Sequence, residues 1–483
     1  MPDTNVALAP ASTQLEMLRS GDISSEELLD LFLARIEKHN PAINVVIAFD
    51  LDRARSEARA VDAARARGDE LPPLAGLPIT IKECFEAVGL PATCGFPFLA
   101  DHRPSEDADA VKALRDAGAI ILGKTNLPQG ASDWQSFNPI YGLSRNPWDH
   151  DRSVGGSSGG SAASVAMGFT AFELGSDIGG SIRIPAHFCG VYGHKSSYGL
   201  VPMRGHIPGM PGALYEVELG VAGPLARSAK DLEMLLPVLA APDKLPLLSA
   251  PRHERLEDFR IGLWLGEGSD YLLDDGVRQE LEAYAERLTA AGARVERVSL
   301  PVDPDESLEI YLNTLFAIVG AGAPGEADEF AKYIDSDPTG MADKMVRYMR
   351  CTLPEWFELQ DKREHLYRKW ASFFDEYDVL LTAPVPIVAF PHMADGEGVH
   401  SEQLERRIIV NGREEPYLDF SWQGLATVAK LPATIVPTGG ASDGMPVGLQ
   451  VIGPFMEDLT PIRFAVLAED ALGGFSPPPD AED

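Results

Sequence analysis

Two glycine-rich segments that end in serines limit how the middle of this chain can fold. They are residues 154–161 (Val-Gly-Gly-Ser-Ser-Gly-Gly-Ser) and residues 175–181 (Gly-Ser-Asp-Ile-Gly-Gly-Ser). Helix-forming residues follow the first segment, and a strand-like run at residues 169–174 precedes the second. Ser157 and Ser158 are therefore predicted to lie where a loop enters a helix. Because glycine has no Cβ and tolerates positive φ, the backbone of both loops can approach a ligand closely.

Strand-like and helix-like patterns alternate along much of the chain. A short β-type run at residues 78–81 ends at Lys82, residues 107–117 have helical periodicity, and residues 119–122 are a compact apolar strand. Further strands are predicted at residues 260–265, 295–300, 379–382, 433–436 and 447–452, with helices between them. This succession predicts an α/β fold with a largely buried sheet and helices on its faces.

The pattern favours one large domain over two independent ones. We predict a domain over residues 1–473, on which a helical segment at residues 1–70 packs. Within that segment, residues 24–27 predict a helix N-cap, and the helix is expected to end before Asn40 and Pro41. Residues 474–483 contain three consecutive prolines and several acids, so we expect a flexible tail there.

Charge and cysteine usage exclude several function classes. The chain has 73 acidic and 41 basic residues, which gives a formal net charge of −32. Such a surface opposes binding to nucleic acid or to an anionic membrane. No apolar run is long enough to span a bilayer, no signal peptide is visible, and the chain has four cysteines without a CxxC spacing. We therefore expect a cytoplasmic protein.

Three mechanisms compete for the two glycine-serine segments. A phosphate-binding loop needs a Gly-Lys step, and His194 interrupts the nearest match. A nucleophile elbow with Ser157 as nucleophile matches G-x-S-x-G literally, but residues 146–152 before it form a poor strand. The third mechanism activates a serine with a neutral lysine whose pKa is lowered by burial. Lys82 fits that role because it follows an apolar strand.

Six motifs occur along the chain in order. They are Gly-Leu-Pro-Ile-Thr-Ile-Lys-Glu at 76–83, Gly-Lys-Thr-Asn at 123–126, Asn-Pro-Trp at 146–148, Gly-Gly-Ser-Ser-Gly-Gly at 155–160, Gly-Ser-Asp-Ile-Gly-Gly-Ser-Ile-Arg-Ile-Pro at 175–185, and Met-Pro-Val-Gly-Leu-Gln-Val-Ile-Gly at 445–453. Together they resemble the amidase signature family from the N-terminal helix to about residue 470. The resemblance implies a single large domain with a central mixed β-sheet covered by helices on both faces.

The resemblance also implies a Ser-cis-Ser-Lys triad. Ser181 matches the family nucleophile, Ser157 matches the bridging serine after a cis peptide bond, and Lys82 matches the base. In this scheme neutral Lys82 takes a proton through the Ser157 hydroxyl while Ser181 attacks an amide carbonyl, and the relay returns a proton to the leaving nitrogen.

Other site residues follow from the same resemblance. Backbone N–H groups are expected to surround the oxyanion at Ile178, Gly179, Gly180 and Ser181. A loop at residues 127–134 matches the family's acyl pocket, which places Gly130, Ala131 and Ser132 at the substrate carbonyl. Three residues are expected to support the site: Ser158, which either holds Lys82 or caps a helix, and Asp177 and Arg183, which are expected to make structural hydrogen bonds.

These features predict an amidase that converts a carboxylic amide to a carboxylate plus an amine or ammonia. No cofactor and no metal are expected. Two alternatives remain: the glutamine-hydrolysing subunit of a tRNA-dependent amidotransferase, and an α/β-hydrolase-type esterase with Ser157 as nucleophile. Residues 308–323 do not resemble that subunit's glutamine-recognition region, while departures at 193–197 and 209–218 leave the substrate open. The expected partner is a small-molecule amide, and a homodimer is left open.

Overall fold

The computed structural model describes residues 3–323, 325–393 and 403–482. Its α-helices are α1 Asp3–Ala7, α2 Ala11–Ser20, α3 Ser25–Ile43, α4 Leu51–Arg67, α5 Asp109–Asp116, α6 Gly159–Ala166, α7 Arg183–Cys189, α8 Ala229–Leu239, α9 Asp275–Ala290, α10 Pro304–Gly322, α11 Glu326–Ala331, α12 Met341–Met349, α13 Leu353–Glu376, α14 Ser421–Val428 and α15 Leu459–Leu472. Its strands are β1 Val46–Phe49, β2 Pro78–Lys82, β3 Ile120–Thr125, β4 Phe137–Asn138, β5 Gly142–Leu143, β6 Glu173–Asp177, β7 Tyr192–Lys195, β8 Val221–Ala226, β9 Arg260–Leu263, β10 Arg294–Arg297, β11 Val379–Thr382, β12 Arg407–Val410, β13 Arg413–Pro416, β14 Ala433–Ser442 and β15 Met445–Ile452.

The largest sheet has eight strands in the order β10-β9-β11-β15-β14-β7-β8-β6. β9 pairs in parallel with β10 and β11, and the pairs from β11 to β6 are antiparallel. A smaller sheet, β1-β3-β2, packs with its strand β2 next to β6. The predicted α/β fold with a mixed sheet is therefore confirmed, and the second sheet brings the end of β2 to the end of β6.

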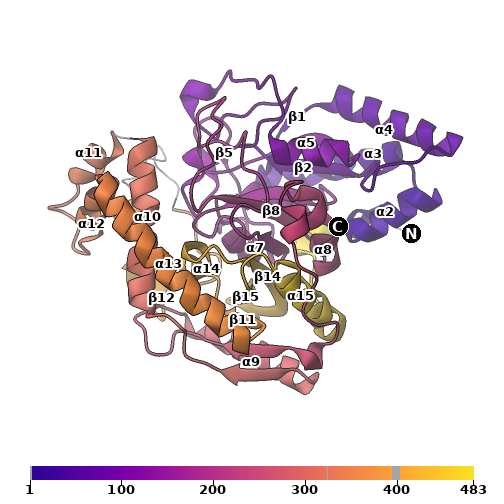
Figure 1. Cartoon of the computed structure of the whole chain (residues 1–483). Helices are drawn as coiled ribbons and strands as arrows, with labels where there is room; N and C mark the ends of the chain where they lie inside the picture. The colour runs from indigo at the N-terminus through magenta and orange to yellow at the C-terminus, as the bar shows by residue number, and fades with distance from the viewer. Residues whose placement is uncertain (1–2, 324, 394–402, 483) are drawn as a thin grey trace.

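Helices cover both faces of the large sheet (Figure 1). α7 packs against β7, β14 and β15, while α8, α9 and α15 also pack against the sheet. α10–α13 gather on one side of the molecule, and the N-terminal helices α2–α5 lie on the other (Figure 1). One continuous hydrophobic core contains buried residues from the N-terminal helices, the sheet and α15. The elements that carry the glycine-serine segments lie inside this core.

Several predicted boundaries differ in the structure, and those of α3 and β6 have a clear physical reason. α3 begins with the predicted capping box of Ser24 and Glu27 but continues through Pro41 to Ile43. A proline in the last turn removes one helical hydrogen bond only, and Asn44 closes the helix in the left-handed conformation. β6 begins at Glu173 instead of residue 169 and pairs with β8 through Asp177. The first half of the second glycine segment is therefore strand, not loop.

Part of the C-terminal tail, for which the sequence predicts flexibility, packs on the protein around Ala481. Pro479–Ala481 forms a 3₁₀-helix, and the Ala481 side chain is fully buried. The Arg35 guanidinium donates a hydrogen bond to the Ala481 carbonyl at 2.8 Å. The two ends of the chain lie close together in Figure 1. A buried arginine that needs acceptors holds this proline-rich segment, which composition alone does not reveal.

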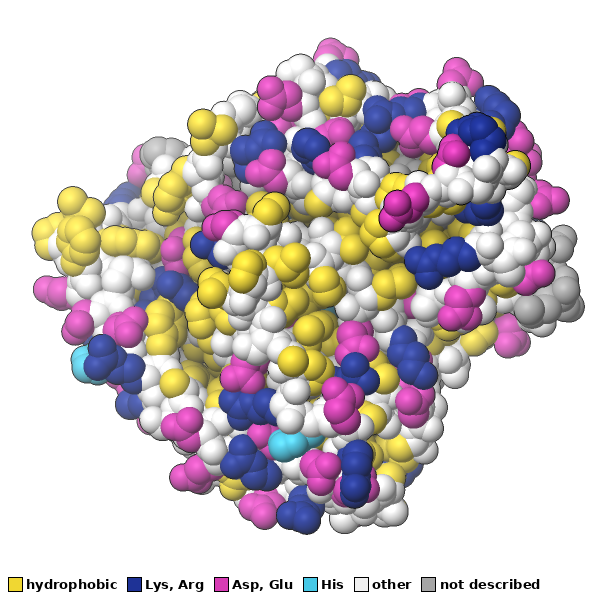
Figure 2. All heavy atoms as spheres, turned by 45° about the vertical axis from the view of Figure 1, so that its right-hand side comes forward, with side chains coloured by type: hydrophobic (Ala, Val, Ile, Leu, Met, Phe, Trp, Pro, Cys, Tyr) yellow, Lys and Arg dark blue, Asp and Glu magenta, His cyan; other side chains and the backbone are white. Residues whose placement is uncertain are grey.

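The visible surface combines both charge signs with apolar side chains. Figure 2 shows acidic and basic side chains interspersed around a band of hydrophobic ones. Met210, Leu214 and Tyr215 are 55%, 78% and 79% exposed and share one loop. No helix among residues 3–323, 325–393 and 403–482 is long and apolar enough to cross a membrane.

Candidate active site

Lys82 ends strand β2 inside the protein and is fully buried. Its Nζ lies within hydrogen-bonding distance of two serine hydroxyls, 2.6 Å from Ser157 Oγ and 2.9 Å from Ser176 Oγ. Burial lowers the pKa of the Lys82 amine below its usual value, although the nearby thiols of Cys84 and Cys94, and less strongly Asp177 and Glu173, oppose this shift. A neutral amine hydrogen-bonded to a serine hydroxyl can accept the proton of that hydroxyl.

Glu173, at the start of β6, lies near Lys82, and its protonation state affects the charge of the Lys82 amine. Burial raises the pKa of this carboxyl to about 8, with hydrogen bonds from neighbouring hydroxyls, among them Thr125, acting against the rise. The carboxyl is therefore largely protonated at neutral pH. An ionised Glu173 would favour the charged form of Lys82, so its neutral state supports a neutral lysine.

Ser157 follows a cis peptide bond with Gly156. Gly156 is required here because a Cβ would collide with the carbonyl oxygen of Asp133. Ser158 follows at the N-cap of α6. Arg152 and Ser153 make isolated bridges, and no strand directly precedes Ser157 in this described part of the chain. That geometry does not favour the esterase alternative, whose nucleophile elbow requires a strand there.

Ser181 lies between the end of β6 and the start of α7 and is 8% exposed, so its surroundings leave a small opening. The Ser158 N–H donates to the Ser181 carbonyl at 3.0 Å. This bond joins the two glycine-serine loops and brings Ser157 and Ser181 into one neighbourhood. Gly180 just before the serine has φ 95°, a conformation that glycine adopts without strain.

One of the four expected oxyanion donors is already occupied. The Gly180 N–H donates to Asp177 Oδ1 at 3.0 Å, whereas the other three N–H groups make no such bond within the loop. In the described part of the chain, the N–H groups of Ile178, Gly179 and Ser181 have no acceptor. These three N–H groups can donate to a bound ligand, and the hydrogen bond of the Gly180 N–H to Asp177 helps to fix the shape of the loop.

Asp177 and Arg183 form a fully buried ion pair that holds the loop. Arg183 Nη2 lies 2.8 Å from Asp177 Oδ1. Burial alone would raise the pKa of Asp177, but Arg183 and the backbone N–H groups of the loop lower it to about 2. Arg183 also donates to the Gln423 carbonyl of α14 and to Gln450 of β15. Both residues thus make the structural hydrogen bonds expected of them.

Replacing Asp177 with alanine should destabilise the protein strongly, because it leaves the buried Arg183 charge without its partner. We expect a loss of about 3–5 kcal/mol in the free energy of unfolding, measured by denaturant titration. Asp470→Ala is the control, since Asp470 pairs with Lys230 at 2.8 Å with both side chains 55% exposed. That change should cost less than about 1 kcal/mol. Equal losses in the two variants would contradict this role of Asp177.

The predicted substrate loop packs directly against the Ser157 loop. Gly130 and Ala131 both have positive φ, and the Gly130 N–H donates to the Cys94 carbonyl at 2.8 Å. Ser132 donates through Oγ to the Gln129 carbonyl and accepts a hydrogen bond from Gln403 at its own carbonyl. Asp133 then contacts Gly156, as described above. This arrangement keeps the loop beside the proposed reacting serines.

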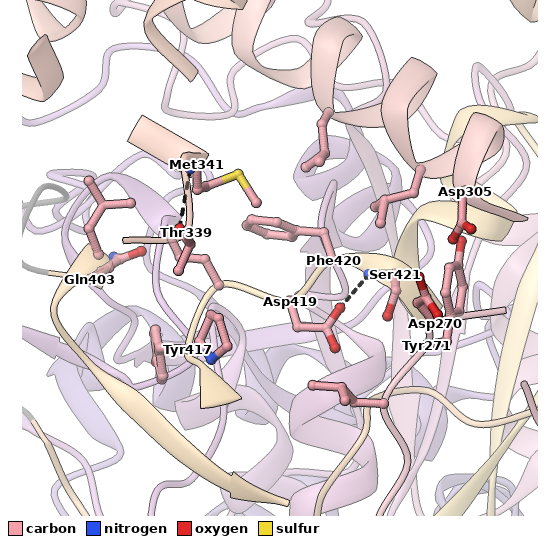
Figure 3. Close-up of a pocket in the computed structure, with 16 residues that line it drawn as sticks. Asp270, Tyr271, Asp305, Thr339, Met341, Gln403, Tyr417, Asp419, Phe420 and Ser421 are labelled. Carbon is pink, nitrogen blue, oxygen red and sulfur yellow. Dashed lines mark hydrogen bonds between the residues drawn. The ribbon is translucent and has the colours of Figure 1, made fainter. Parts of the chain in front are cut away.

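A pocket of about 210 Å³ is lined by Phe420 and by other residues outside the loop that carries Ser181. In Figure 3, Gln403 and Tyr417 lie at one side and Asp270, Tyr271 and Asp305 at the other, with Asp419 and Phe420 between them. The Phe420 ring also lies against Gly179, where a Cβ would be 3.2 Å from the ring. Phe420 therefore connects the pocket wall with the loop at residues 178–181.

Two residues that sequence reasoning missed extend the lysine network. Ser176, in β6, accepts from Lys82, and its Oγ lies 2.8 Å from His206 Nε2. Ser158 binds the backbone of Ser176 at 3.2–3.3 Å, so it neither bonds Lys82 nor caps α6 through its side chain. The Ser-Asp step in residues 175–177 could have indicated Ser176, but no sequence signal linked His206 to this site.

The other buried histidines serve the core. His187 bonds the backbone of Ile387 and Gly448, and His194 bonds Thr434 and Asp458. Within the described ranges, no group of three His, Cys, Asp or Glu side chains is arranged to hold a metal ion.

Taken together, the α/β fold and the buried lysine–serine pair place this chain among the hydrolases. Residues 27–460 match the Amidase family model. The chain is 32% identical to a glutamyl-tRNA(Gln) amidotransferase subunit from Synechococcus sp. (strain CC9605), over 96% of this chain and 97% of that protein. It therefore belongs to the Amidase family and is an amidase, a hydrolase of C–N amide bonds.

Two solved structures show how closely the fold agrees. A bacterial aryl acylamidase of the amidase signature family superimposes with a TM-score of 0.79 at 25% identity, covering 96% of each chain. A glutamyl-tRNA(Gln) amidotransferase subunit from Thermotoga maritima gives a TM-score of 0.75 at 26% identity, covering 98% of each chain. The predicted family and fold are thereby confirmed.

Proposed function

We propose that this protein hydrolyses a small-molecule carboxylic amide through an acyl-enzyme on Ser181, with Ser157 and Lys82 as a proton relay. The observation that carries the proposal is the buried 2.6 Å hydrogen bond between Lys82 and Ser157, beside the loop that bears Ser181. A serine hydroxyl is a weak nucleophile until a base removes its proton, and a buried neutral lysine supplies that base.

Acylation balances protons along the relay. Ser181 Oγ attacks the carbonyl carbon, its proton passes to Ser157 Oγ, and the Ser157 proton passes to Lys82. The C–N bond breaks as the proton returns from Lys82 through Ser157 to the leaving nitrogen, which departs as a neutral amine or ammonia. In the second half, water attacks the ester carbonyl by the same relay and regenerates Ser181 with release of the carboxylate.

Charge that develops on the carbonyl oxygen needs donors that are already in place. We propose the N–H groups of Ile178, Gly179 and Ser181 for this role, because their loop is held by the Asp177–Arg183 pair. Such donors act without reorganisation during the reaction, and losing one costs on the order of 3 kcal/mol in other enzymes. Gly130, Ala131 and Ser132 are proposed to line the scissile carbonyl on the side of Ser157.

The pocket next to the oxyanion loop is proposed to hold the acyl group. It is lined by the carboxylates of Asp270, Asp305 and Asp419, and no lysine or arginine lines it within the described residues. Burial raises the pKa of Asp305 and Asp419, and the neighbouring Asp270 adds to the rise at Asp305. These carboxylates would repel an acyl group that carries a negative charge of its own. We therefore propose neutral or cationic acyl groups as substrates.

The purified chain should hydrolyse neutral aryl amides without partner proteins. It should hydrolyse amides whose acyl group carries a carboxylate more slowly. For two anilides of matched length, one neutral and one with a terminal carboxylate, we expect kcat/KM to be at least about tenfold higher for the neutral one. Asp305→Asn and Asp419→Asn should each reduce the ratio of the two kcat/KM values. Equal values for both anilides in the wild type would contradict this assignment of the pocket.

A second candidate function is the glutamine-hydrolysing subunit of an amidotransferase. The observation in its favour is the 32% identity to such a protein over nearly the whole chain. A subunit of this kind would release ammonia from glutamine chiefly in the presence of partner proteins. Ammonia release from glutamine by the purified chain, compared with aryl amide hydrolysis, separates the two candidates.

We also propose a cytoplasmic location. Cys84, Cys94, Cys189 and Cys351 are all free thiols. Free thiols of this kind are typical of a reducing compartment.

The reaction as proposed uses side chains and backbone N–H groups only, and no cofactor takes part in it.

A further inference from the structure

Four side chains form a hydrogen-bonded line from the proposed relay towards the edge of the core. Ser157 Oγ lies 2.6 Å from Lys82 Nζ, which lies 2.9 Å from Ser176 Oγ. Ser176 Oγ in turn lies 2.8 Å from His206 Nε2. The first three side chains are buried, whereas His206 is half-buried. The relay described above uses Ser157 and Lys82 but leaves Ser176 and His206 without a task.

The direction of each hydrogen bond follows from counting donors and acceptors. A neutral lysine amine has two N–H donors and one lone pair, and as a base it must offer the lone pair to Ser157. It must then donate an N–H to Ser176 Oγ. A serine hydroxyl carries one proton of its own, so the Ser176 O–H must point away from Lys82. His206 Nε2, at 2.8 Å, is the acceptor available in that direction.

We infer that His206 is a positioning residue for the base, acting through Ser176. Its unprotonated Nε2 accepts the Ser176 O–H, and Ser176 can then only accept from Lys82. The lone pair of Lys82 therefore stays directed at Ser157. Without this acceptor, the Ser176 hydroxyl can turn and donate to Lys82, competing with Ser157 for the same lone pair. The inference rests on the proposed role of Lys82 as the base.

The surroundings of His206 hold its ring in place. The ring packs edge-on against Phe85, with centroids 5.0 Å apart and an interplanar angle of 79°. Cys84 Sγ lies 3.2 Å from the same Nε2 and gives this nitrogen a second contact. The preceding residue must be Gly205, because φ is 84° and a Cβ would be 2.6 Å from Ala108 Cα. Phe85, Cys84 and Ala108 thus fix the segment that presents the imidazole.

The test compares His206→Phe, His206→Gln and His206→Asn by single-turnover acylation with an activated anilide. Phenylalanine keeps the ring but removes the acceptor, glutamine can place an amide oxygen near the Nε2 position, and asparagine is polar but too short. We expect His206→Phe and His206→Asn to lower the acylation rate by about 10- to 100-fold with little change in KM, and His206→Gln to stay within about fivefold of the wild type. Thermal unfolding checks that each variant is folded.

A double-mutant cycle with Ser176→Ala decides whether His206 acts through Ser176. The loss in His206→Phe and His206→Asn is expected to come from a Ser176 hydroxyl that turns towards Lys82. We therefore expect each double variant with Ser176→Ala to be no slower than the slower of its two single variants. Losses that multiply in the double variant, or near-normal rates in both single variants, would overturn the inference. Mapping of a fluorophosphonate label separates this failure from failure of the relay itself. A wild type labelled at Ser181 together with unaffected His206 variants refutes only the role of His206.

Discussion

Replacing Ser181 with alanine should abolish amide hydrolysis, because the acyl bond of the proposed mechanism forms on this oxygen. Removal of the nucleophile in other serine hydrolases lowers kcat on the order of 10⁶-fold, so we expect no turnover above the background rate. The measurement is steady-state hydrolysis of an activated anilide at high enzyme concentration. The change removes one hydroxyl from a side chain that is 8% exposed, and the fold should survive it.

Ser164→Ala is the matched control for this experiment. Ser164 lies buried in α6, its hydroxyl has no hydrogen-bond partner among the described residues, and the proposed relay does not use it. We expect this variant to keep activity within a few-fold of the wild type. A Ser181→Ala enzyme that retains a substantial part of the activity would remove Ser181 from the role of nucleophile.

Lys82→Ala should slow acylation by about 10⁴-fold or more, as expected when the base of a hydroxyl-activating triad is removed. Lys82→Arg should not restore the rate, because a guanidinium stays protonated and cannot accept a proton. In the wild type the rate should rise with pH as Lys82 loses its proton. Since burial lowers the pKa of Lys82, this rise should begin below the pH at which an ordinary lysine titrates.

Lys195→Met tests whether position or a lowered pKa makes a lysine catalytic. Lys195 is also buried, and burial lowers its pKa to about 7, but it donates to the backbone carbonyls of Leu431 and Ser196. It has no serine hydroxyl to activate, so acylation by a folded Lys195→Met variant should stay within about tenfold of the wild type. Near-normal acylation by Lys82→Ala would refute the relay.

Much of the fold could be predicted because hydrophobic patterns report which strands are buried. β11 lies where the sequence predicts it, and β2 ends at Lys82 as expected. The end of β6 at Asp177 was missed because Gly175 and Ser176 resemble loop residues, whereas pairing with β8 makes them strand. The ordered tail was missed for a related reason, since its partner Arg35 is more than 400 residues away in sequence.

Some features of the proposed site could likewise be predicted from the sequence, and others could not. The resemblance to the amidase signature family predicted that Lys82 and Ser157 lie together, and their side chains are 2.6 Å apart. The hydrogen bond of the Gly180 N–H depends on the orientation of the Asp177 carboxylate. The spacing of residues along the sequence does not predict that orientation. His206 reaches Ser176 only because the chain folds back beside β2 and β6. Contacts of this kind are properties of the tertiary structure.

The central claim is that Ser181, and not Ser157, carries the acyl group. The most direct test is to label the wild-type protein with a fluorophosphonate and to identify the modified residue by peptide mass spectrometry. We predict the label on Ser181, with no labelling of Ser181→Ala and strongly slowed labelling of Lys82→Ala. A label on Ser157 in the wild type would contradict this claim and would favour the nucleophile-elbow alternative.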